Sequence, residues 1–300
     1  MHHPPTNPTR PSQAVGPTVT LLLVPTGSAI AFGPVGAVLC GACAAGWRWE
    51  SDALLSLGWA VFIAEVLWGT WRAHLVDMQW GAYIAAHPLP PRGASPPGLP
   101  YTTPWSPLGR LLNGWGRLRR WMREELPVER RGALLTLPIL PPLILLLSAL
   151  VGWQMLVLSL AALSLSLVEW RFARRGQATL ALRAGMEIGL SWLAGHAAFG
   201  PLTWASFVLA CCYALAYQGL LSLDDERRPW SLGLLYGGQG AALVLLLLGH
   251  ATWGAAAVGI LLAPQLLLLS RSQADGWRAW YVRRAAPFAL AAMVIAAWAV

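Results

Sequence analysis

Apolar runs long enough to cross a lipid bilayer recur along this chain, separated by polar, arginine-bearing stretches. A helix needs about 20 apolar residues to span the hydrocarbon core. The alternating ten-residue patterns of a membrane β-barrel are absent from the sequence. The pattern therefore predicts an all-α, polytopic membrane protein. We expect nine spanning helices, at residues 18–47, 52–77, 132–150, 154–172, 180–199, 202–223, 232–249, 251–269 and 286–300.

The remaining segments indicate a tail followed by one membrane domain. Residues 1–17 are polar and proline-rich, which predicts a disordered N-terminal tail. Residues 18–300 form a single transmembrane domain with a long polar loop at 80–131. Within this loop, residues 108–125 repeat apolar side chains at three- and four-residue intervals with arginines between them. We expect an amphipathic helix in the headgroup plane; the alternative is a solvated connector.

Composition and charge agree with this interpretation. The chain is 56% hydrophobic and 11% charged, which excludes an ordinary soluble domain. Its net charge of +8 comes entirely from arginine, because the sequence contains no lysine. Most arginines lie in the tail or in the loops after helices 2, 4, 6 and 8, which indicates membrane topology and argues against nucleic-acid binding. The positive-inside rule places the N-terminus and loops 2–3, 4–5, 6–7 and 8–9 on the cytoplasmic side of the cell membrane.

Two adjacent acids stand at the mouth of the helix predicted at 202–223. They are Asp224 and Asp225, and the short basic segment Glu226–Trp230 follows them. Carboxylates at the end of a membrane helix are costly to place, so they indicate a functional site by default.

The C-terminal part of the chain carries a family likeness in five stretches, Trp192–Trp204, Tyr213–Asp225, Ser231–Ala242, Ala263–Leu266 and Ala286–Phe288. These stretches resemble the UbiA prenyltransferase superfamily, and within it the chlorophyll and bacteriochlorophyll synthase branch. The likeness covers roughly residues 180–300, and the first 80 residues share only the helix layout. The resemblance implies a nine-helix UbiA-type bundle whose polar loops 2–3 and 6–7 face each other.

The resemblance also implies a chemistry. Enzymes of this superfamily transfer a prenyl group from a prenyl diphosphate to a hydrophobic acceptor, and Mg²⁺ held by two Asp-rich motifs neutralises the diphosphate. In this chain Asp77 and Asp225 match motif acids and are the expected catalytic residues. The expected Mg²⁺ ligands are Asp77, Asp224, Asp225 and Glu226. Arginines in the same loops would bind the diphosphate directly through forked hydrogen bonds, and they are Arg92, Arg227 and Arg228.

Both Asp-rich motifs are reduced relative to the family pattern. Val76, Gly81 and Ala85 stand where the first motif has Asn and two further acids, and the second loop is shortened to Glu226–Trp230. One hypothesis is a divergent Mg²⁺-dependent prenyltransferase with a tetrapyrrole- or quinone-type acceptor. The alternative is an inactive pseudoenzyme that binds a pigment or isoprenoid, or that partners an active synthase. A transporter is a third possibility, but no inverted repeat supports it.

Four further polar residues lie inside predicted helices. Arg183 and Glu187 are four residues apart, which indicates an intramembrane ion pair or a wall of a polar cavity. His196 is expected to hydrogen-bond backbone, with ligation of a chlorin magnesium as the alternative. Glu65 lies deep in the second predicted helix, and its position makes it a further candidate for the cavity.

Overall fold

The computed structural model describes residues 33–47, 50–88, 106–177, 179–223, 228–270 and 277–300. Every regular element in these ranges is a helix, which confirms the all-α prediction. The chain divides into two compact units. Residues His87–Thr136 belong to one unit, and Leu21–Ala86 together with Leu137–Val300 form the other, a helical bundle.

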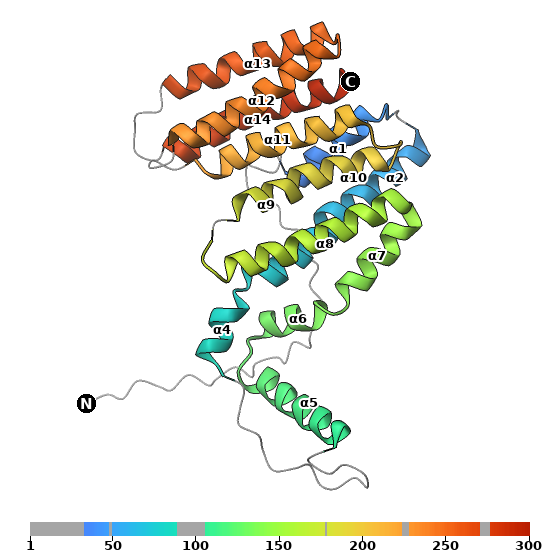
Figure 1. Cartoon of the computed structure of the whole chain (residues 1–300), viewed down its shortest axis with the longest axis vertical. Coiled ribbons are helices and arrows are strands. Elements are labelled where there is room, and N and C mark those ends of the chain that lie inside the picture. Colours follow the sequence, from blue (N-terminus) through green and yellow to red (C-terminus); the bar gives the residue numbers. More distant parts are fainter. Residues whose placement is uncertain (1–32, 48–49, 89–105, 178, 224–227, 271–276) are drawn as a thin grey trace, which may run out of the picture. The chain divides into compact units, whose positions relative to one another are not determined.

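Within the described residues, helices lie at most of the positions predicted from the sequence (Figure 1). Two of the predicted helices, 52–77 and 180–199, include π-helical segments. Its α-helices are α1 (Pro34–Ala44), α2 (Ser51–Val61), α3 (Gly69–Arg72), α4 (Trp80–Ala86), α7 (Leu140–Val151), α8 (Trp153–Ala173), α9 (Leu180–Ala184), α10 (Ser191–Ala197), α11 (Trp204–Leu221), α12 (Arg228–Leu248), α13 (Thr252–Ser270) and α14 (Trp277–Trp298). The π-helical segments are η2 (Phe62–Trp68), η3 (Ala73–Asp77) and η4 (Gly185–Leu190). The most extensive packing joins α11 to α12, α1 to α10 and α13 to α14.

Several of these helices are long and apolar enough to cross a membrane. Within the described residues five qualify, Ala53–Ala86, Trp153–Ala173, Trp204–Leu221, Pro229–Leu248 and Thr252–Leu269. A sixth is added if the bent pair Arg130–Thr136 and Leu140–Val151 is counted as one span. A multi-pass membrane protein is therefore supported, whereas the count of nine spans stays a prediction. The first expected helix, at 18–47, is described only from residue 33, and α1 lies within that described part.

Three of the predicted helices differ from the structure in their bounds or continuity. The helix expected at 132–150 is interrupted after Thr136 and restarts at α7, whose first turn holds Pro141 and Pro142. Helix α12 already includes Arg228, four residues before the predicted start at Leu232, and Pro229 is compatible with an early helical turn, where no N–H partner is required. Helix α14 already includes Trp277, so the segment from Trp277 to the predicted start at Ala286 is helical.

Glycine allows α1 and α10 to approach with their backbones in contact. A Cβ atom on Gly195 would lie 2.0 Å from the carbonyl oxygen of Val38, and one on Gly41 would lie 1.8 Å from that of Trp192. Small residues at such crossings are the usual means by which membrane helices pack closely. This contact fixes α10, and through it η4, against the start of the bundle.

The unit His87–Thr136 contains α5 (Pro107–Glu124) and α6 (Val128–Thr136). Ser106 caps α5, accepting a hydrogen bond from the Gly109 amide at 2.9 Å, and Pro107 occupies the first turn. At the other end, Arg131 donates to the carbonyl of Arg123 at 3.1 Å. The helix predicted at 108–125 is thus confirmed as a helix.

Candidate functional site

Three π-helical segments each bring one acid to the same pocket. Glu65 lies in η2, Asp77 ends η3 and Glu187 lies in η4. A π-helical turn adds a residue to the helical repeat, which rotates the following side chains relative to a regular α-helix, and such turns are frequent at functional sites. The local geometry therefore sets which side chains of these helices face the pocket.

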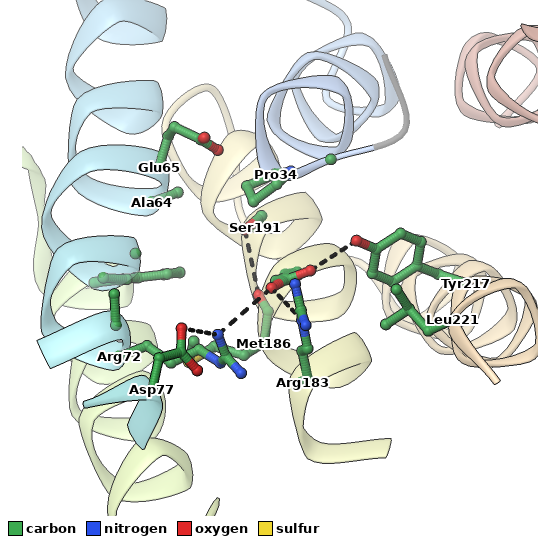
Figure 2. Close-up of a pocket in the computed structure, with 15 residues that line it drawn as sticks. Pro34, Ala64, Glu65, Arg72, Asp77, Arg183, Met186, Ser191, Tyr217 and Leu221 are labelled. Atoms are coloured by element: carbon green, nitrogen blue, oxygen red, sulfur yellow. Dashed lines mark hydrogen bonds and ion pairs between the residues drawn. The ribbon is translucent and has the colours of Figure 1, made fainter. Parts of the chain in front are cut away.

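The pocket encloses about 250 Å³ within the bundle (Figure 2). Its walls come from the start of α1, from η2 to η3, from α9 to α10 and from α11. The lining residues combine apolar and charged side chains: Gly33, Pro34, Ala64, Glu65, Trp68, Gly69, Arg72, Ala73, Asp77, Arg183, Met186, Glu187, Ser191, Tyr217 and Leu221. The site can therefore hold a ligand that has both a polar and an apolar part.

Arg72 is the centre of the buried charge cluster. Its guanidinium makes two hydrogen bonds to Glu169 on α8, at 2.7 and 2.9 Å, and both side chains are almost fully buried. The same guanidinium lies 3.4 Å from Asp77 and 4.0 Å from Glu187. Because a buried charge in a membrane span must be paired, the bond to Glu169 fixes Arg72 in place and makes it part of the pocket floor.

Glu187 is held by partners on two helices. The Nε atom of Arg183 donates to its Oε1 at 2.8 Å, and the Tyr217 hydroxyl on α11 donates to its Oε2 at 2.7 Å. The predicted ion pair between Arg183 and Glu187 is confirmed, and both residues also line the pocket. The two alternatives considered for this pair, structural pair and cavity wall, are therefore both correct.

Two charged groups remain accessible to a ligand. The side chain of Asp77 is 58% exposed and that of Arg183 is 36% exposed, whereas Arg72 and Glu169 are 9% and 1% exposed. Arg183 engages Glu187 through Nε, and no other bond of its guanidinium to a described residue is found. Asp77 and Arg183 are thus the groups that the polar end of a ligand can reach first.

Glu65 lies apart from the arginines. It precedes Arg72 by seven residues on a continuous helical stretch, about 10 Å along the axis. In Figure 2 no dashed line joins its carboxyl group to the hydrogen bonds and ion pairs of the charged cluster. It makes no hydrogen bond with another described residue, and its Oε2 atom is buried. The pocket therefore has a second polar point that a ligand donor group would satisfy.

The described residues do not by themselves fit a Mg²⁺ site. Asp77 is the described member of the predicted ligand set, and it is paired with Arg72. Within the described ranges, no three acid, histidine or cysteine side chains are grouped to hold a metal ion. The other predicted site residues lie outside the described part of the chain: Arg92, Asp224, Asp225, Glu226 and Arg227, together with the side chain of Arg228.

Three residues of the cluster were missed from the sequence, namely Arg72, Glu169 and Tyr217. A signal was present for two of them, because Arg72 and Glu169 are charged residues inside predicted membrane helices, and such residues are expected to have partners. Their pairing was not predictable from spacing, since 97 positions separate them. Tyr217 carried no signal that distinguishes it from an aromatic packing residue.

His196 makes the backbone hydrogen bond that was expected from the sequence. Its Nε2 atom lies 2.9 Å from the carbonyl oxygen of Pro201, to which it donates a hydrogen bond, and its side chain is nearly buried. This backbone bond is the expected one, and His196 does not line the pocket.

One comparison with known proteins gives a match. The chain is 42% identical over 66 residues to the bacteriochlorophyll synthase 34 kDa chain of Chloroflexus aurantiacus, and the match covers 22% of this chain and 21% of that relative. The matched segment thus spans about a fifth of the relative's length. No protein-family model matches the chain, and no solved structure matches it significantly.

Proposed function

We propose that this protein is a divergent membrane prenyltransferase of UbiA type, which binds a prenyl diphosphate in the pocket described above and transfers its prenyl group to a tetrapyrrole- or quinone-type acceptor. The observation that carries the proposal is that one pocket inside a bundle of membrane helices combines two accessible charged side chains, Asp77 and Arg183, with apolar walls. The partial similarity to bacteriochlorophyll synthase supports the same class of reaction.

The pocket's own residues would position the substrate. The terminal nitrogens of Arg183 would donate to diphosphate oxygens, because a guanidinium matches phosphate geometry. Arg72 would contribute positive charge from the floor while Glu169 holds it. The apolar walls, which include Trp68, Met186 and Leu221, would receive the allylic end of the prenyl chain. Arg92, Arg227 and Arg228 remain the proposed additional diphosphate ligands, and Asp224, Asp225 and Glu226 the proposed additional metal ligands.

The test is an assay of purified protein with geranylgeranyl diphosphate, Mg²⁺ and candidate acceptors. We expect Asp77→Asn and Asp225→Asn each to lower turnover on the order of a hundredfold. Arg183→Gln should raise the KM for the diphosphate by about tenfold, because it removes a charge-assisted hydrogen bond. Arg174→Gln is the matched control, since Arg174 is an exposed arginine at the end of α8 that does not line the pocket. Full turnover in the Asp77 and Asp225 variants would contradict the proposal.

A second candidate is a non-catalytic binder of a pigment or isoprenoid, or a partner of an active synthase. It is favoured by the pairing of the described pocket acids: Asp77 faces Arg72, and Glu187 is bonded to Arg183 and Tyr217. Acids engaged in this way are less available to a metal. In the same preparation, tight binding of a prenyl ligand or pigment without any turnover would support this candidate over the enzyme.

The placement in the cell completes the proposal. The arginine distribution supports a location in the cytoplasmic membrane, with the N-terminus and loops 2–3 and 6–7 on the cytoplasmic side. A prenyl diphosphate would then enter the pocket from the cytoplasm.

A further inference from the structure

One face of α5 carries apolar and basic side chains in a single line. Leu112, Trp115, Arg119 and Arg123 follow one another at spacings of three, four and four residues, which places them on the same side of the helix. All four are exposed within their unit, Leu112 to 36% and Trp115 to 58%. We call these four residues the α5 stripe.

The side chains of Trp115, Arg119 and Arg123 differ from the neighbouring Trp121 in having no polar or ring partner among the described residues. Trp121 is buried, and its Nε1 atom donates to the carbonyl of His87 at 2.9 Å, which anchors the helix within its unit. The side chains of Trp115, Arg119 and Arg123 make no hydrogen bond, ion pair or ring contact with any residue in the described ranges. The helix is therefore held by one side while the stripe remains available.

The charge of α5 selects the kind of partner. The helix contains five arginines, Arg110, Arg117, Arg119, Arg120 and Arg123, and a single acid, Glu124. The boundary between lipid headgroups and acyl chains suits a helix face on which Trp and Leu adjoin Arg. The indole ring prefers the headgroup level, and the arginine side chains can extend toward the lipid phosphates. The same chain has several helices long and apolar enough to cross a bilayer, so α5 is tethered to a membrane protein.

We infer that the α5 stripe binds anionic phospholipids, with Leu112 and Trp115 inserted at the boundary between headgroups and acyl chains and with Arg119 and Arg123 on lipid phosphates. The surface potential of an anionic leaflet contributes about 1 kcal/mol per arginine, which corresponds to about fivefold in lipid preference for each. This binding is independent of the proposed prenyl transfer.

The test uses the full chain with the photocrosslinking amino acid p-benzoylphenylalanine in place of Trp115. The protein is reconstituted in vesicles of phosphatidylcholine alone or mixed with phosphatidylglycerol, and crosslinked lipids are identified by mass. We expect crosslinks to phosphatidylglycerol in excess of its share of the mixture. The double variant Arg119→Gln/Arg123→Gln should lower that excess by about fivefold per arginine.

Two controls separate the stripe from general effects. The crosslinker at Glu124 lies nine positions from Trp115, on the opposite side of the helix, and should give few lipid adducts. The variant Arg171→Gln/Arg175→Gln removes two exposed arginines near the end of α8 and should leave the phosphatidylglycerol excess unchanged. Crosslinks from position 115 to protein, equal lipid yields from positions 115 and 124, no excess of phosphatidylglycerol, or an equal fall in the α8 control would each overturn the inference.

Discussion

At the residue scale, the pair formed by Arg72 and Glu169 holds the pocket together. Two hydrogen bonds of 2.7 and 2.9 Å join side chains that are both almost fully buried. A buried ion pair need not stabilise a protein more than a well-packed apolar pair, but removing one partner leaves the other charge uncompensated. The stability of the protein with either charged residue in place therefore depends strongly on the presence of its partner.

We predict that Arg72→Met and Glu169→Leu each lower the free energy of unfolding by about 3–5 kcal/mol. The double variant should lose much less than the sum, because no charge is then left unpaired. Unfolding in detergent, followed by circular dichroism, measures all three variants. Arg171→Met on the same helix is the control and should change little, since Arg171 is exposed. Additive losses in the double variant would show that the pair is not coupled.

Some residues of the pocket were predicted from the sequence. Asp77 was predicted from the motif resemblance, and the pair of Arg183 and Glu187 from helical spacing. The structure brings all three to one pocket. Glu169 reaches that pocket's floor from α8, a connection between distant segments that spacing along one helix does not contain.

At the element scale, the π-helical segments are the main difference between the helices predicted from the sequence and those of the structure. The apolar pattern predicted helices over 52–77 and 180–199, and helices are found there. A pattern with a 3.6-residue period does not reveal where a helix gains an extra residue per turn. Segments η2, η3 and η4 do so at the three places where Glu65, Asp77 and Glu187 face the pocket.

The contact between α1 and α10 gives a prediction at the same scale. Gly195→Val should prevent this packing, because even a Cβ atom would lie 2.0 Å from the carbonyl oxygen of Val38. We expect a loss of at least about 3 kcal/mol or failure to accumulate in the membrane, since overpacking against backbone has no flexible side chain to yield. Folded yield and thermal midpoint in detergent are the measurements.

The matched control is Gly58→Ala in α2. A Cβ atom there has no neighbour within 4 Å, and alanine favours a helix over glycine. This variant should be as stable as the parent protein or slightly more stable. Equal stability of the Gly195→Val and parent proteins would contradict the close helix contact.

At the scale of the whole molecule, the number of membrane crossings is the main prediction still to be tested. The sequence predicts nine spans, whereas five or six helices in the described residues meet the length and hydropathy expected of a span. An odd number of crossings from a cytoplasmic N-terminus puts the C-terminus on the far side. We therefore predict that alkaline phosphatase fused after Val300 is active and that a green fluorescent protein fused there is dark.

A second fusion site calibrates this experiment. The same reporters placed after Arg175, in the basic loop between the fourth and fifth predicted helices, should behave in the opposite way. Fluorescence at Val300 together with fluorescence at Arg175 would show an even number of crossings and would reject the nine-span topology.

By itself the sequence determined that this is an all-α membrane protein, where most helices lie, and that α5 is an amphipathic helix rich in arginine. These features follow from hydrophobic length, periodicity and charge, which are local properties of the chain. The tertiary structure decided which charges meet. Arg72 and Glu169 must pair because unpaired charges are too costly in a membrane interior, but many helix arrangements would satisfy that requirement. The packing of glycine surfaces and the positions of the π-helical turns select one arrangement, and with it the pocket.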